Sequence, residues 1–349
     1  MKIRGCIKID LIIKPTQACN FRCDFCSSTN IVSNNAETLP LENIFNFLKY
    51  NQVNSIIVNG GDPLMMPPKY YHDILDFIDR NNMKTTLSFT SNLWDFYLHP
   101  NKWIPLFQRH NMKVCTSFQY GNQRKLADGR VYTEELFKEV FNKFYYLFNK
   151  RLMFISTTSE ENEDKVIDTV KLAKQLQTKC KINPIVFSGR STSSYPYYKM
   201  IAHYFDIIES ELYKYEITSN ELVKISNDND HTICPFNRKC HFNIRCIGPN
   251  SIMHSCGSIN DLHEYHKTNN MKTYCLSGDT ITYSENELAN DYNFLTKKCF
   301  ACNMFIICNS CRHRIYDIIN HGNVEEHCTH MKELEERWNN ICKRKYIYK

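Results

Sequence analysis

The chain has 349 residues, enough for one large domain or two smaller ones, and 17 of the residues are cysteine. Small secreted proteins that depend on disulfide bonds contain about 8–10% cysteine or more, so the composition excludes that class. Lys and Arg number 43 against 37 Asp and Glu, a formal charge of +6 that is spread along the chain, so the composition does not favour a nucleic-acid-binding protein.

No run of 18 apolar residues occurs, and the first ten residues carry charges where a signal peptide needs an apolar segment. We therefore expect a cytoplasmic protein with no membrane segment. In a reducing compartment, an odd number of closely spaced cysteines indicates metal binding or catalysis rather than disulfide bonds.

Up to about residue 214, short runs of Val, Ile, Leu and Phe alternate with longer segments whose apolar residues recur every three or four positions. The short runs are typical of parallel strands covered on both faces, and the longer segments are typical of amphipathic helices. The alternation predicts an α/β fold of six βα units. The predicted strands span 9–14, 55–59, 85–90, 113–118, 152–157 and 181–187, and helices are expected at 40–50, 70–81, 133–149 and 164–177.

A polar, acidic segment at 227–230 ends this alternation, and most of the cysteines follow it. We therefore expect two domains, the βα units in 1–226 and a small cysteine-rich domain in 227–349.

Directly after the first predicted strand, Cys19, Cys23 and Cys26 follow one another at spacings of four and three residues. Three thiolates can hold a four-iron cluster and leave its fourth iron open to an external chelate, whereas four thiolates would close it. The alternatives are a zinc knuckle or three unpaired buried thiols, but no second ligand pair of the kind zinc needs follows nearby.

These three cysteines, with Phe25 before the last of them, resemble the signature loop of radical S-adenosylmethionine (SAM) enzymes. The segment Gly60, Gly61, Asp62 and Pro63 at the end of the second strand is similar to the Gly-Gly-Glu-Pro segment of that family, with Asp in place of Glu. The resemblance implies a partial (β/α)6 TIM-like barrel whose glycine segment binds the amino group of SAM. Glycines suit such a site because a ligand can approach their backbone closely.

Polar residues at the ends of later strands resemble positions that flank SAM in the family, although each could also be an ordinary loop residue. They are Ser91, Asn92, Ser117, Gln119, Asn162 and Arg190.

The cysteines of the C-terminal part resemble the SPASM domain of peptide-maturing radical SAM enzymes, which carries two auxiliary four-iron clusters. The resemblance assigns Cys234, Cys240, Cys256 and Cys311 to the nearer cluster and Cys299, Cys302, Cys308 and Cys328 to the farther one, with Cys246 as a substitute for Cys234. A zinc ribbon of Cys299, Cys302, Cys308 and Cys311 is the alternative. Two departures from the family are the two-residue gap between Cys308 and Cys311, and Ser251 where relatives have glycine.

Cys275 lies alone between the ligand groups and could donate a hydrogen atom to a substrate radical, although an ordinary core or surface cysteine is the simpler interpretation. His313, His327 and His330 could tune a cluster through hydrogen bonds, but we expect solvated helix residues.

The resemblance implies reductive cleavage of SAM to a 5′-deoxyadenosyl radical, which removes a hydrogen atom from a peptide or protein substrate and leads to an oxidative crosslink of the carbon–carbon, thioether or cyclophane type. It also implies a reductant such as flavodoxin or ferredoxin. The alternatives are a formylglycine-forming sulfatase maturase, a dehydrogenase or epimerase of sugars or aminoglycosides, and a non-catalytic iron–sulfur or zinc module.

Overall fold

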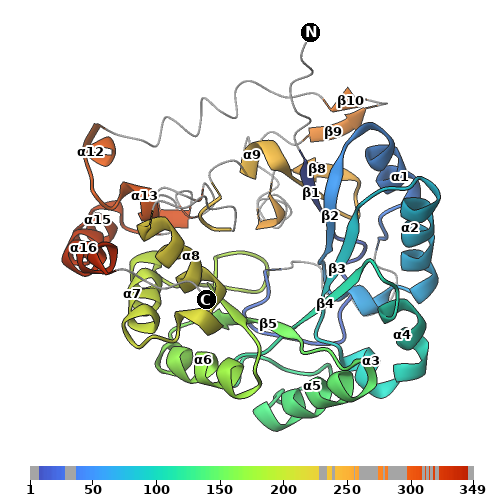
Figure 1. Cartoon of the computed structure of the whole chain (residues 1–349), viewed down its shortest axis with the longest axis horizontal. Helices are drawn as coiled ribbons and strands as arrows, with labels where there is room; N and C mark the ends of the chain where they lie inside the picture. The colour runs from blue at the N-terminus through green and yellow to red at the C-terminus, as the bar shows by residue number, and fades with distance from the viewer. Residues whose placement is uncertain are drawn as a thin grey trace.

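The computed structural model describes residues 8–27, 37–227, 234–237, 240–254, 256–258, 274–277, 280–281, 297–308, 311, 314, 317–318 and 322–344. Its centre is a curved sheet in which six parallel strands follow one another in chain order (Figure 1). These strands are β1 (Ile9–Ile13), β2 (Val53–Val58), β3 (Thr86–Thr90), β4 (Met112–Ser117), β5 (Met153–Thr158) and β6 (Cys180–Pro184).

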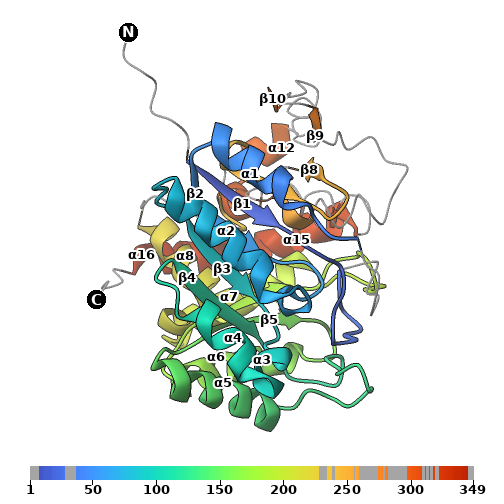
Figure 2. The same cartoon turned by 90° about the vertical axis from the view of Figure 1, so that its right-hand side faces the viewer.

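Helices between and after the strands pack on the outer face of this sheet (Figures 1 and 2). Helix α5, for example, buries Phe137, Val140, Phe141 and Phe144, which recur at helical spacing. The helices are α1 (Leu41–Tyr50), α2 (Pro68–Arg80), α3 (Trp94–Leu98), α4 (Pro100–Phe107), α5 (Glu134–Phe148), α6 (Val166–Gln175), α7 (Tyr197–Glu209) and α8 (Ile217–Ser226).

The six strands and the α/β class are confirmed, and each strand overlaps its predicted span. Sequential parallel order with helices on the outside is the arrangement of a partial βα barrel. The carboxyl ends of the six strands therefore share one edge, and the loops after them can meet there.

The cysteine-rich part continues the same sheet on the other side of β1. Strand β7 (Ile244–Ile247) pairs in parallel with β1, and β8 (Ile252–His254), β9 (Tyr274–Ser277) and β10 (Thr280–Ile281) follow in antiparallel order. In the turn between β7 and β8, Ser251 has a φ of 64°, the left-handed conformation that glycine adopts most easily. The glycine that relatives carry here is thus replaced by serine without loss of the turn.

The C-terminal helices α15 (Val324–Glu333) and α16 (Glu335–Lys343) pack against α7 and α8. The Arg337 guanidinium lies 2.7 Å from a carboxylate oxygen of both Asp206 and Glu209 on α7, which fixes α16 to the barrel. The shorter helices are α9 (Cys240–Asn243), α12 (Lys297–Phe300) and α13 (Phe305–Cys308). Within the ranges given above, no helix is both long and apolar enough to span a membrane.

Candidate functional site

The loop that carries the first three cysteines is held by segments that follow three different strands. After β2, Gly61 and Asp62 donate their backbone N–H groups to Thr16 and Ala18 at 2.9 and 2.8 Å. After β4, the backbone oxygen of Gln123 accepts from the N–H of Asp24, and that of Lys125 accepts from the N–H of Arg22. After β6, the backbone N–H of Arg190 donates to the oxygen of Cys26 at 2.8 Å. The common edge of the parallel strands thus shapes this loop, as the sequence predicts.

The three thiols of this loop are close enough for the charges of Cys23 and Cys26 to act on Cys19. Cys19 and Cys23 are buried and Cys26 is half-buried. Burial raises the pKa of the Cys19 thiol, and the charge of Asp62 and then those of Cys23 and Cys26 raise it further. Burial therefore favours the protonated Cys19 thiol, and a cluster that binds here would have to displace that proton.

The two glycines after β2 allow the close approach of the cysteine loop. A Cβ atom on Gly61 would stand 2.1 Å from the carbonyl oxygen of Ala18, and one on Gly60 would stand 2.5 Å from that of Thr16. Gly60 also has a φ of 126°, which L-residues rarely adopt. Both positions therefore need glycine for packing against the loop, whatever ligand the segment binds.

The side chain of Asp62 faces the end of β3. It accepts hydrogen bonds from the Ser91 hydroxyl at 2.9 Å and from the Asn92 backbone N–H at 2.8 Å. The amide of Asn92 in turn donates to Oδ1 of Asn20 at 2.7 Å and lies 3.9 Å from the sulfur of Cys19. Asp62, Ser91 and Asn92, three of the predicted site residues, thus form one network beneath the cysteine loop.

Arg124 is a site residue that the sequence analysis missed. It is buried, its two Nη atoms donate to Ser117 Oγ at 3.0 Å and to Gln119 Oε1 at 3.4 Å, and its guanidinium lies 5.2 Å from the ring centre of Phe25. Nε of Arg124 and Nε2 of Gln119 are buried with no hydrogen-bond partner among the described residues. Buried unpaired donors are costly, so this cationic group, next to the cysteine loop, suits an anionic ligand.

The remaining predicted residues around the mouth have different environments. Asn162 uses its amide to donate to the carbonyl oxygens of Tyr120 and Thr157 and accepts from the backbone of Ser159, so it fixes the loop after β5. Arg190 lies 4.0 Å from the Asp24 carboxylate. Pro63 is buried at the start of a 3-10 helix (Pro63–Met65).

The C-terminal cysteines fall into two groups. Burial raises the pKa of Cys308 to about 12, and the charges of Cys328, Cys299 and Cys302 contribute. The pKa of Cys311 is raised by its own burial and by the charges of Cys234 and Cys256. Cys308 and Cys311 therefore face different sets of thiols, although only two residues separate them.

Two further cysteines were predicted for the nearer auxiliary cluster, Cys240 as a ligand and Cys246 as a substitute for Cys234. Cys240 begins α9 and is half-buried, whereas Cys246 is fully buried inside β7, opposite Ile12 and His254 of the neighbouring strands. Within the described part of the chain, no three His, Cys, Asp or Glu side chains are grouped to hold a single metal ion, and this includes Cys19, Cys23 and Cys26 of the first loop.

His327 contacts a predicted ligand, which corrects the expectation of a solvated residue. It is buried on α15, and its Nε2 lies 3.2 Å from the sulfur of Cys308. Burial and the neighbouring His330 lower the pKa of His327 to about 4, so its ring is neutral at pH 7. His330 is partly exposed, and its ring stacks on Tyr198 at 4.4 Å and pairs with Glu333. His313 lies outside the described residues.

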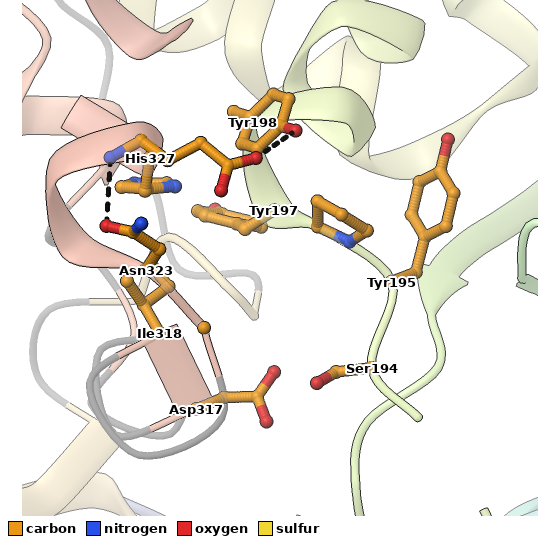
Figure 3. A pocket seen from close by; sticks show the side chains of 11 residues that line it. Ser194, Tyr195, Tyr197, Tyr198, Asp317, Ile318, Asn323 and His327 are labelled. Carbon is orange, nitrogen blue, oxygen red and sulfur yellow. Dashed lines mark hydrogen bonds between the residues drawn. The ribbon is translucent and has the colours of Figure 1, made fainter. Parts of the chain in front are cut away.

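A pocket of about 130 Å³ lies beside His327 (Figure 3). The stacked rings of Tyr197 and His327, 6.4 Å apart, form one side of it, with Asp317 and Ser194 on another. His327 thus lines the pocket and also contacts the sulfur of Cys308. Cys275, the predicted hydrogen donor, lies in β9, whose backbone pairs with β8, and its side chain is outside the described part.

Comparison with known proteins agrees with this geometry. A family model described as the radical SAM superfamily matches residues 13–193. The fold resembles anSMEcpe with bound AdoMet, at a TM-score of 0.71 and 14% identity over 97% of this chain and 96% of that one. It also resembles Streptococcus suis SuiB bound to precursor peptide SuiA, at a TM-score of 0.59 and 15% identity over 87% of this chain and 71% of that one.

At these identities the structural matches show a shared fold, and no curated protein gives a significant match. The family model spans more than half of the chain and includes the cysteine loop, the glycine segment and Arg124. The chain therefore belongs to the radical SAM superfamily.

Proposed function

We propose that the protein is a radical SAM enzyme that forms an oxidative crosslink in a peptide, with one SAM-binding four-iron cluster and two auxiliary four-iron clusters. The observation that carries the proposal is the three-cysteine loop at the mouth of the barrel, which the glycine segment and the loops after β4 and β6 hold in place. The cysteines of the C-terminal part supply ligands for the auxiliary clusters. Two proteins of the same fold have been solved with peptides, anSMEcpe with the Cp18Cys peptide and SuiB with SuiA.

The residues at the mouth fit a cluster with a chelating ligand. Cys19, Cys23 and Cys26 would hold three irons, and the unpaired donors of Arg124 and Gln119 fit the carboxylate of SAM. When bound, the cluster and SAM supply the electron and the radical that remove a hydrogen atom from the substrate. The chain contributes a loop fixed by backbone hydrogen bonds and a buried cation, Arg124.

The C-terminal groups fit two clusters better than one zinc ribbon. A ribbon would need Cys308 and Cys311 in the same set, whereas each of them interacts with different thiols. We assign Cys299, Cys302, Cys308 and Cys328 to one cluster and Cys234, Cys240, Cys256 and Cys311 to the other. Cys246 is a poorer candidate than Cys234 because it is fully buried in the interior of a strand, whereas the charge of Cys234 acts on Cys311.

Closed auxiliary clusters suit the removal of an electron from a substrate radical, which crosslink formation requires. A reductant of the flavodoxin or ferredoxin class would supply the electron that cleaves SAM. Formylglycine formation, an alternative that the resemblance in sequence implies, is the second candidate.

The test is anaerobic incubation of the reconstituted protein with SAM, a reduced flavodoxin and candidate peptides that contain aromatic or cysteine residues. We expect 5′-deoxyadenosine and a peptide that has lost two hydrogen atoms and keeps its sulfur. Replacement of a cysteine sulfur by oxygen would identify formylglycine formation instead. Absence of 5′-deoxyadenosine from a protein that contains iron would contradict both.

Changing Gly61 to Ala should remove the SAM-binding cluster, because the new Cβ would overlap the backbone of the cysteine loop. Iron per chain should fall by about four, while the auxiliary clusters remain. Gly129→Ala is the control: no atom lies within 4 Å of its would-be Cβ, and its φ of 88°, which Gly61 does not share, makes it the more strained backbone position for alanine. Unchanged iron in Gly61→Ala would show that the loop does not need this close approach.

A further inference from the structure

Both carboxylate oxygens of Asp62 are occupied inside the protein. Oδ1 accepts from the backbone N–H of Leu64 and from the Ser91 hydroxyl, each at 2.9 Å. Oδ2 accepts from the backbone N–H of Asn92 at 2.8 Å, and the Ser91 hydroxyl lies 3.1 Å from it. The residue is 2% exposed, so little of it is left for a ligand.

The bond to Leu64 explains why this chain has Asp where relatives have Glu. Asp62 is the N-cap of the 3-10 helix that starts at Pro63. Asp is one of the best N-cap residues because its short side chain reaches the N–H two residues ahead, and Glu is one methylene too long for that contact. The extra methylene would also have to fit a space that is already filled.

Asn92 is fixed on two sides by these contacts. Asp62 accepts from its backbone N–H, and its side-chain oxygen accepts from the backbone N–H of Trp94 at 2.9 Å. The amide Nδ2 therefore points in one direction, to Oδ1 of Asn20 at 2.7 Å and to the sulfur of Cys19 at 3.9 Å.

We propose that Asp62 is a positioning residue for the first cluster ligand: it holds Asn92 against Asn20 and Cys19, and it does not bind SAM. The inference rests on the proposed SAM-binding cluster. Besides this connection through Asn92, Asp62 contacts the cysteine loop directly. Its backbone N–H donates to the carbonyl oxygen of Ala18, next to Cys19. The family's carboxylate is thus used in this chain to stabilise the cluster loop.

The test compares Asp62→Asn, Asp62→Glu and Ser91→Ala in the reconstituted full-length protein, without peptide. One readout is the rate at which a chelator removes the EPR signal that responds to SAM, and the other is the dissociation constant of SAM for the protein that still holds its cluster. Asp10→Asn is the matched control, because Asp10 also accepts side-chain hydrogen bonds, from Ser55 and Asn54, but at the opposite end of the sheet.

We expect Asp62→Asn and Asp62→Glu to lose the signal about tenfold faster than the parent protein, and Ser91→Ala about threefold faster, since each removes part of a buried charged network. SAM affinity of the loaded protein and the behaviour of Asp10→Asn should match the parent. A Glu variant that keeps its cluster and binds SAM at least as tightly would identify Asp62 as a direct ligand and overturn the inference. A parent protein without a SAM-responsive signal would overturn the proposed function itself.

Discussion

Replacing Arg124 by Gln should weaken SAM binding by about 10- to 100-fold, since a hydrogen bond from a charged donor contributes about 1.5–3 kcal/mol and each 1.4 kcal/mol is a factor of ten. Arg124 is buried beside Phe25 of the cysteine loop, and its Nε has no partner among the described residues. A carboxylate would pair with this group, and a neutral amide cannot replace the charge or the fork of donors.

The measurement is the dissociation constant of SAM for the reconstituted protein, with iron content determined in parallel to confirm that the cysteine loop is intact. Arg124→Lys should give an intermediate affinity because it keeps the charge and loses the fork. Arg130→Gln is the control, since Arg130 lies in the same loop but is exposed and pairs with Asp128. Equal affinities for Arg124→Gln and the parent would exclude Arg124 from the SAM site.

Changing Cys308 or Cys311 to Ser should each remove a different auxiliary cluster. Three four-iron clusters amount to about 12 irons per chain, so each single variant should retain about eight and the double variant about four. The physical reason is the separation of the two thiols, which interact with different sets of cysteines although they are three positions apart. Both single variants should still form 5′-deoxyadenosine, because the SAM-binding cysteines are untouched, but should lose the crosslinked peptide.

The control for these variants is Cys342→Ser, since Cys342 is exposed near the end of the last described helix and is not an assigned ligand. Iron and EPR spectra of the reduced protein distinguish which cluster is lost. Two single variants with the same iron content as the double variant would mean that Cys308 and Cys311 serve one metal site, and the assignment of two auxiliary clusters would be wrong.

The strands of the barrel could be predicted from sequence because buried parallel strands are continuous runs of apolar residues. Strand β7 could not, because its four residues include Arg245, and a charged residue argues against a strand buried on both faces. In the structure Arg245 is nevertheless buried, and β7 pairs with β1. Strand β7 therefore forms because it pairs with β1 at the edge of the barrel. The local sequence pattern does not predict it.

The cysteine loop could be predicted because its ligand spacing is local, whereas the roles of Arg124 and Asp62 depend on contacts between distant segments. Arg124 lies in a polar loop and has the sequence signature of a solvated residue; only the packing of Phe25, Ser117 and Gln119 around it makes it a buried cation. The same holds for His327, which the charged surroundings of α15 suggest is solvated, but which the fold turns toward Cys308.

The most direct test of the account is the iron and sulfide content per chain after anaerobic reconstitution, for the parent and for the variant with Cys19, Cys23 and Cys26 all changed to Ala. The account predicts about 12 irons in the parent and about eight in the variant. About four irons per chain in the parent and none in the variant, together with bound zinc, would contradict it. The C-terminal cysteines would then form a structural zinc site rather than two iron–sulfur clusters.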